Sequence, residues 1–194
     1  MRVKYRQYGL PLYKAAIQGD WEAARQIYSM YPHCFATTIT KGGDTALHIA
    51  AVARRIDFVE QLVKLLVQEN CTHLLAVRNN IGNTALCLAA TSGSVKIARL
   101  MIDADINLLK MPGNASGLTP LHMAALLGKR EMVNYLLWHG HTQNFLTHEQ
   151  RCDIFISTIN SDLYDVALDL LLQHGELIMA RDDETRETPL HSLL

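Results

Sequence analysis

The chain has 194 residues, of which 49% are apolar and 19% are charged, so it has enough apolar residues to build a continuous core. Its 18 basic and 19 acidic residues leave a formal net charge of −1, which gives no electrostatic signal for binding nucleic acid or an anionic membrane surface. The sequence contains no signal-peptide pattern and no run of 18 apolar residues, so we expect no direct membrane insertion of this segment.

Four ten-residue blocks of similar sequence recur along the chain. They begin at Leu10, Thr45, Thr84 and Thr119, so successive starts lie 35, 39 and 35 residues apart. A partial copy, Thr-Pro-Leu-His-Ser-Leu-Leu, fills residues 188–194, two periods after the fourth block. The midpoint of that gap predicts a hidden fifth block at residues 153–162, where apolar residues occupy the matching positions.

Each block predicts one helix, and the apolar residues that follow it at helical spacing predict a second. Threonine at the start of a block suits a helix N-cap, and Pro120 or Pro189 suits the first helical position. Gly19, Gly93 and Gly128 supply the positive φ that ends the first helix. Paired alanines inside the blocks leave room for neighbouring helices to pack closely.

The recurring Thr-Pro-Leu-His-x-Ala letters resemble the ankyrin repeat. The resemblance covers about residues 10–194 and implies an all-α ankyrin-repeat solenoid of stacked helix-turn-helix units with β-hairpin fingers, whose first helices form a concave face. After a lead-in over residues 1–9, we expect repeats at about residues 10–43, 44–82, 83–117, 118–151 and 152–186, with a partial sixth at 187–194.

The block threonines and histidines are interpreted as structural. In the family, this histidine makes hydrogen bonds within and between turns. Three equivalent histidines about 70 residues apart in sequence cannot converge on one catalytic site. The structural set comprises Thr45, His48, Thr84, Thr119, His122, Thr188 and His191.

Two departures from the pattern affect the second repeat. Arg54 stands where the family prefers glycine, so the turn there is either strained or differently shaped. The repeat is also four residues longer than its neighbours, and the run from Ile56 to Asn70 predicts that its second helix carries the surplus turn. Elsewhere, Tyr13, Cys87 and Ile156 replace the signature histidine.

The sequence favours neither catalysis nor a metal site. It contains no nucleophile elbow, P-loop or His-Glu-x-x-His motif, so we expect no enzyme activity and no cofactor. His139, His141, His148 and Cys152 cluster within 14 residues, but their spacing differs from that of structural zinc sites and they fall in the expected connection between repeats four and five. Free cysteines of a reducing compartment are favoured over disulfides, which indicates a cytoplasmic chain.

In the family, partner contacts come from finger tips and from the two positions that precede the glycine of the first helix. Apolar residues at such positions, Val52 among them, favour a protein partner. The alternative, that they fill the seam between repeats, stays open. The candidate contacts are Lys41, Val52, Asn80, Ile81, Thr91, Ser92, Ala115, Ser116, Leu126 and Leu127.

The favoured function is a non-catalytic, monomeric scaffold for protein–protein interaction. Residues 82–90 and 162–171 are similar to plant membrane-associated ankyrin proteins with a C-terminal PGG domain, which implies the cytosolic part of a membrane-tethered signalling protein in defence or stress. The PGG motif is absent from this sequence. We expect a longer protein, because Thr188 opens a repeat that stops before its second helix. The alternative is the cytosolic ankyrin portion of an ion channel or acyltransferase.

Overall fold

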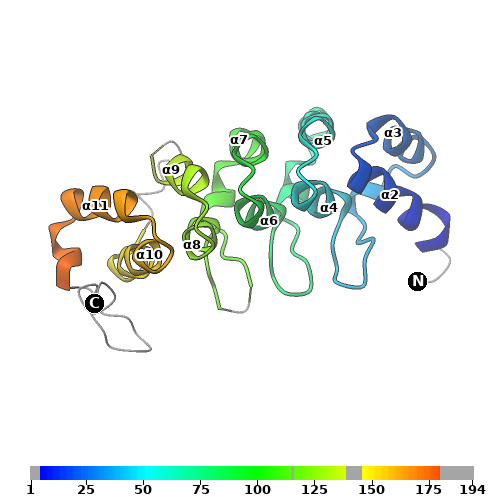
Figure 1. Ribbon diagram of the computed structural model, residues 1–194. Helices are drawn as coiled ribbons and strands as arrows, with labels where there is room; N and C mark the ends of the chain where they lie inside the picture. The colour runs from blue at the N-terminus through cyan, green and yellow to red at the C-terminus, as the bar shows by residue number, and fades with distance from the viewer. Residues whose placement is uncertain (1–4, 115, 139–145, 180–194) are drawn as a thin grey trace. The chain divides into compact units, whose positions relative to one another are not determined.

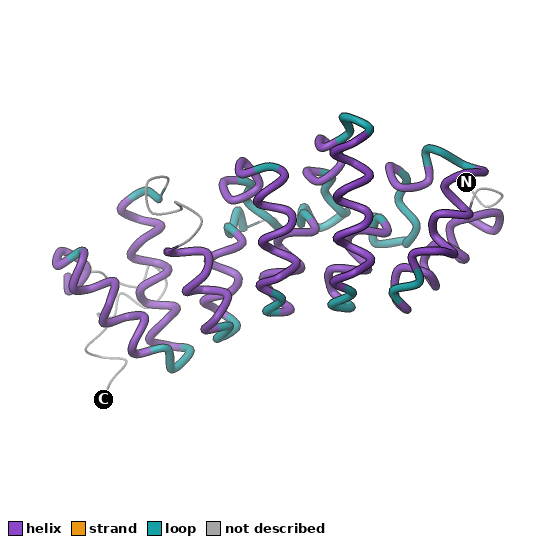
Figure 2. The backbone as a smooth tube through the Cα atoms, turned by 90° about the horizontal axis from the view of Figure 1, so that it is seen from above, coloured by secondary structure: helices purple, strands orange, loops and turns teal. Residues whose placement is uncertain are grey.

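A computed structural model of the chain describes residues 5–114, 116–138 and 146–179 (Figure 1). The chain divides into two compact units, residues 1–120 and residues 121–194, and each is described by itself. The described residues form helices joined by loops and contain no strand (Figure 2). None of these helices has both the length and the apolar character needed to cross a bilayer.

The first unit consists of three helix pairs that follow a helical turn at Tyr5–Gly9. The first helix of each pair coincides with a sequence block, and the second carries the apolar pattern that follows the block. The pairs are α2 (Leu10–Gln18) with α3 (Trp21–Met30), α4 (Ala46–Val52) with α5 (Ile56–Gln68), and α6 (Ala85–Ser92) with α7 (Val95–Ala104). Short 3-10 helices follow the pairs at Cys34–Ala36, Thr72–Ala76 and Ile106–Lys110.

The helices of this unit form two rows. In one row α4 packs between α2 and α6, and in the other α5 packs between α3 and α7 (Figure 1). The paired alanines of the blocks are buried between the first helices, as their small side chains predict. Phe58 is fully buried at the start of α5 and meets the edge of the Trp21 ring, with 5.6 Å between ring centroids.

The second unit contains α8 (Pro120–Leu126, whose first residue ends the first unit), α9 (Arg130–Trp138), α10 (His148–Asn160) and α11 (Tyr164–Gln173), followed by a 3-10 helix at Gly175–Met179. The pair α10 and α11 lies where the sequence predicts a hidden fifth block. Its first helix begins at His148, five residues before the block, because Thr147 and Gln150 form a capping box there. The repeat boundaries assigned from the sequence stay predictions.

The turn that ends each first helix has the same left-handed backbone in every described pair. Gly19, Gly93 and Gly128 have φ values of 79°, 72° and 60°, as predicted. Arg54 and Asp162 hold the same position with φ values of 57° and 58°. The second repeat therefore keeps the usual turn and bears the strain of a side chain in this region.

The length difference of the second repeat is also accounted for. The helix α5 has 13 residues, whereas α3 and α7 have 10 each. The additional residues extend α5 by close to one turn, as the sequence predicts.

The loops before α4, α6 and α8 form the fingers. A backbone hydrogen bond closes each of them, from Ile39 to Asp44, from Asn79 to Asn83 and from Gly113 to Leu118, with N···O distances of 2.7, 2.9 and 2.7 Å. Since the described part of each finger lacks regular strands, the expected hairpins are tight hydrogen-bonded loops.

Candidate functional site

His48 ties the first helix of its repeat to the next finger. Its Nδ1 accepts the backbone N–H of Thr45 at 3.3 Å and lies 2.9 Å from the Thr45 hydroxyl. Because Nδ1 is an acceptor, Nε2 carries the hydrogen and donates to the Asn83 carbonyl at 3.0 Å. Burial lowers the pKa of His48, although the Asn83 carbonyl and Asp44 act in the opposite direction. A neutral, fixed imidazole agrees with the structural role expected for it.

The first two fingers are joined by side-chain and backbone bonds. Asp44 Oδ1 accepts from Asn79 Nδ2 at 2.9 Å. The Asn80 backbone N–H donates to the Gly42 carbonyl at 2.8 Å, and Asn80 Nδ2 donates to the Lys41 carbonyl at 2.9 Å. These bonds fix one finger against the next, while the side chains of Lys41, Asn80 and Ile81 stay exposed at the tips.

The second and third fingers are joined differently, because Cys87 replaces the histidine. Cys87 makes local contacts with Thr84, which caps α6. The link to the third finger comes from Asn83 Oδ1, which accepts the Asn114 backbone N–H at 2.8 Å, and from the Arg78 guanidinium, which donates to the Gly82 and Pro112 carbonyls. Sequence reasoning missed these links, although the polar run from Arg78 to Asn80 offered a signal.

In the second unit, His122 links α8 to the next helix pair. Its Nε2 lies 3.1 Å from Ser157 Oγ in α10, and Ser157 Oγ donates to the Asp153 carbonyl at 2.7 Å. The ring nitrogen is therefore the donor to Ser157. Burial of the ring disfavours its charged form and lowers the pKa of His122. Thr119, the matching threonine, is buried just before α8.

The third finger and the end of the chain contain the remaining residues assigned from the sequence. Ala115, Thr188 and His191 lie outside the described residues. Ser116 is described and is exposed beside the third finger tip. The third finger therefore offers one described candidate contact.

The positions before the first-helix turns differ in what they contact. Thr91 and Ser92 are half-buried, and their hydroxyls donate to the Leu88 and Ala89 carbonyls at 2.9 and 3.0 Å. The Ser92 hydroxyl also lies 3.4 Å from the Ala51 carbonyl of the preceding repeat. Val52, in contrast, is 52% exposed. Thr91 and Ser92 thus bond to the helices, whereas Val52 presents an apolar side chain to solvent.

Leu126 and Leu127 lie at the end of α8, and both are exposed. The Leu126 carbonyl accepts from Ser161 Oγ at 3.1 Å, which ties the end of α8 to the end of α10. This bond uses the backbone and leaves both leucine side chains accessible within the second unit.

The possible zinc ligands are only partly described. His148 and Cys152 were expected in a connection, but they lie one turn apart in α10, where His148 Nε2 is 3.5 Å from Cys152 Sγ. His139 and His141 lie outside the described residues. Elsewhere, burial raises the pKa of the Cys34 thiol to about 12 and also raises that of Cys87, so both are poor nucleophiles.

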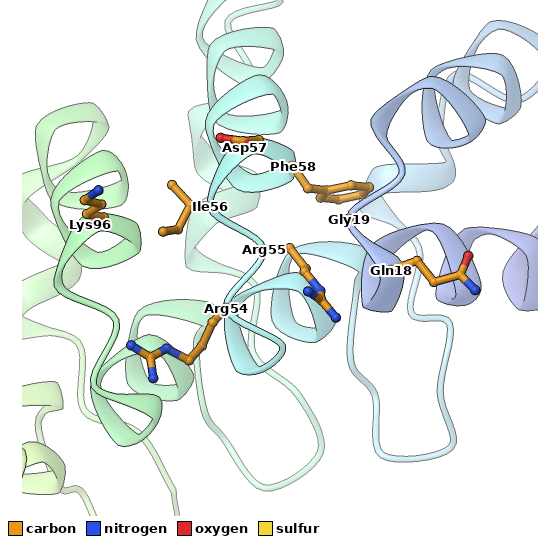
Figure 3. Close-up of a pocket in the computed structure, with 8 residues that line it drawn as sticks. All are labelled: Gln18, Gly19, Arg54, Arg55, Ile56, Asp57, Phe58 and Lys96. Carbon is orange, nitrogen blue, oxygen red and sulfur yellow. The ribbon is translucent and has the colours of Figure 1, made fainter.

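A groove that sequence reasoning missed opens at the turn between α4 and α5. Figure 3 shows the side chains that line it. Its volume is about 370 Å³. Arginine at a position that favours glycine was the sequence signal that pointed to it. Three cationic side chains from two repeats contribute to its wall, which consists of Gln18, Gly19, Arg54, Arg55, Ile56, Asp57, Phe58 and Lys96.

A family model for ankyrin repeats (3 copies) matches residues 60–149. The chain is 24% identical to the nuclear factor NF-kappa-B p105 subunit of Gallus gallus over 184 residues, which cover 93% of this chain and 18% of that protein. It is 37% identical to the ankyrin repeat-containing protein ITN1 of Arabidopsis thaliana over 115 residues, which cover 51% of this chain and 20% of that protein. The chain thus spans about a fifth of the length of either relative.

The fold also matches a chain in the crystal structure of the yeast ribosomal protein Rps3 in complex with its chaperone Yar1. The TM-score is 0.59 at 24% identity, and the match covers 66% of this chain and 90% of that chain. Assignment to the plant family with a PGG domain stays a prediction. Residues 60–149 match ankyrin repeats, and the paired helices of the chain have the ankyrin-repeat fold.

Proposed function

We propose that the chain is a non-catalytic scaffold that binds a protein partner through its finger tips and the exposed ends of its first helices. The observation that carries this proposal is the exposure of Val52 at the end of α4, beside half-buried Thr91 and Ser92 at the end of α6. An exposed aliphatic side chain gains free energy when a partner removes it from water. Leu126 and Leu127 offer the same chemistry in the second unit.

The finger network supports the proposal because it holds the binding residues in place before a partner arrives. Hydrogen bonds cross a repeat boundary at His48, at Asp44 and at Asn83. A surface that is already ordered loses less conformational entropy on binding. The exposed tips at Lys41, Asn80 and Ile81 therefore lie on a rigid base.

The wider role that we propose is the cytosolic part of a membrane-tethered plant signalling protein in defence or stress. The likeness to the ankyrin repeat-containing protein ITN1 of Arabidopsis thaliana supports a plant origin for this arrangement of repeats. In this proposal the segment is monomeric, needs no cofactor, binds no nucleic acid and acts at the cytosolic face of the plasma membrane. A search of the native protein for a PGG motif with membrane-spanning helices, or for a channel or acyltransferase domain, separates this role from its alternative.

The test of partner binding compares two valines of one repeat. The immobilised chain is used to capture partners from an extract, and the same is done with Val52→Glu and with Val67→Glu. Val67 is 47% exposed but belongs to α5, the other row of helices, so it is a matched control. We expect Val52→Glu to abolish capture and Val67→Glu to retain it. Full capture by Val52→Glu would refute the assignment of this surface.

A further inference from the structure

We propose that the groove at the turn between α4 and α5 binds an acidic segment of the protein partner, with Asp or Glu carboxylates against Arg54, Arg55 and Lys96. This inference rests on the proposed protein-binding function and names the chemistry of the segment that is bound. Figure 3 shows that the three cationic side chains come from the α4–α5 turn and from α7.

The groove concentrates positive charge in a chain that is close to neutral overall. Its wall carries three cations and one carboxylate, that of Asp57. Among the described residues, no carboxylate forms an ion pair with Arg54, Arg55 or Lys96. The first turns of α5 and α7 add the positive ends of their helix dipoles. A ligand with negative charge therefore meets an attractive field that no ion pair among the described residues neutralises.

Lys96 departs from the pattern of its own repeat position. The second residue of each second helix is acidic in the other four pairs, at Glu22, Asp57, Glu131 and Asp165. An acidic residue there is stabilised by the helix dipole, and a lysine is not. The helix α7 is accordingly without an acidic residue in its first turn.

Arg54 and Arg55 break two further local rules at the same groove. Arg54 adopts φ 57°, where glycine is favoured and where a side chain adds strain. Arg55 is the N-cap of α5, a position that favours a hydrogen-bond acceptor, and its side chain caps nothing. The three residues with unfavourable local conformations or positions all line one groove, and departures of this kind are typical of a functional site.

Arg55 is already held in place for binding. Its Nε donates to the Ile17 carbonyl at 2.7 Å, and its aliphatic part packs against Gly19. A Cβ on Gly19 would lie 3.2 Å from Arg55 Cδ, so the missing side chain of Gly19 makes this packing possible. Since one nitrogen is fixed by the carbonyl, the rest of the guanidinium can donate to a carboxylate with little further loss of side-chain entropy.

The groove suits a peptide better than a free phosphate. The groove has a volume of about 370 Å³ and is open to solvent, so it can admit an extended segment. Asp57 and Gln18 supply hydrogen-bond acceptors for the N–H groups of a peptide. A phosphate has no N–H group to donate to them. Exposed Ile17 and Val52 lie within two residues of the groove wall in sequence and offer contacts for an apolar residue next to the acidic one.

The test uses the full chain and a fluorescein-labelled decapeptide in which Glu alternates with Leu. Fluorescence anisotropy measures its affinity for the unchanged chain, for Lys96→Glu and for Arg54→Gly. Lys96→Glu restores the acidic residue of the other repeats, and Arg54→Gly restores the glycine of the turn, so neither should lower the melting temperature. We expect Lys96→Glu to weaken binding about tenfold and Arg54→Gly to weaken it less, because the first reverses a charge and the second removes one.

Two controls decide the outcome. Arg25→Glu makes the same charge change on the exposed surface of α3, outside the groove wall, and should leave the affinity close to that of the unchanged chain. A peptide with Gln in place of Glu should bind more weakly. The proposal is overturned if Lys96→Glu and Arg25→Glu bind alike, if the Gln peptide binds equally well, or if inorganic phosphate displaces the probe where chloride of equal ionic strength does not.

The capture experiment with Val52→Glu keeps this inference separable from the proposed function. Loss of partner capture by Val52→Glu, together with failure of the acidic probe to bind the unchanged chain, would overturn the groove and leave the protein-binding function intact. The opposite result is that Val52→Glu still captures partners fully, while the probe binds the unchanged chain and Lys96→Glu weakens that binding. This result would overturn the binding surface at Val52 and leave the groove proposal intact.

Discussion

Replacing Gly43 with alanine tests whether the fingers are locked together as the structure shows. Gly43 is buried in the first finger with φ 81°. A Cβ there would lie 2.3 Å from Asn80 Oδ1 and 2.8 Å from the Asn80 backbone nitrogen, which is far closer than real contacts allow. The two fingers must therefore separate, and the bond from Asn80 N–H to the Gly42 carbonyl must break.

Gly117→Ala is the matched control. Gly117 has φ 70°, but a Cβ on it would meet no atom within 4 Å, so this variant reports the backbone strain alone. That strain costs about 1 kcal/mol. Gly43→Ala bears the same strain and also loses the two hydrogen bonds that Asn80 makes to the first finger. Each is worth about 0.5–1.5 kcal/mol, so the total cost is about 2–4 kcal/mol.

Thermal melting followed by circular dichroism measures both variants. For a chain of this length, 1 kcal/mol corresponds to about 2–4 °C in melting temperature, so we expect a fall of about 2–4 °C for Gly117→Ala and about 4–16 °C for Gly43→Ala. Hydrogen exchange should show that the Asn80 amide loses its protection only in Gly43→Ala. Equal destabilisation of the two variants would refute the interlocked fingers.

Two further predictions concern stability. Burial lowers the pKa of His48 below its usual 6.5, so the unfolded chain takes up a proton first as the pH falls below about 6.5. The stability that is present above this pH is therefore lost on acidification. Between pH 7.5 and pH 5, the melting temperature should fall less in His48→Gln than in the control His33→Gln, whose histidine is exposed. Leu121 is 1% exposed, so Leu121→Ala should lower the free energy of unfolding by about 2–5 kcal/mol, measured with denaturant. Leu126 is exposed, so Leu126→Ala should change it by no more than about 0.5 kcal/mol. Equal losses would show that the helix register is wrong.

The repeat architecture could be predicted from the sequence because it depends on short local patterns that recur. Glycine at positions 19, 93 and 128 marks the end of each first helix, and the longer second repeat marks the longer α5. The hidden fifth pair followed from spacing alone. The start of α10 at His148 did not, because Thr147 and Gln150 cap it through a local pattern that lies outside the block.

The candidate site was harder to predict because it depends on contacts between repeats. The sequence identifies Arg54 as an exception but leaves open whether the turn changes shape or bears strain, and the observed φ of 57° decides for strain. The groove joins Arg54 to Lys96, 42 residues later, through the packing of α5 against α7. The asparagine hydrogen bonds between fingers also depend on how neighbouring repeats are placed against each other. The sequence of the repeated blocks does not specify that placement.

Hydrogen exchange of the full chain, with and without a captured partner, tests whether the partner binds at the finger tips and at the ends of the first helices. Binding through the finger tips and first-helix ends predicts slower exchange at residues 40–44 and 79–83 and at the turn around Arg54. The helix α5 beyond its first turn should exchange at the same rate in both samples. Protection confined to α5 and α7, with fingers and turns unchanged, would refute this binding surface, because the partner would then bind the opposite row of helices.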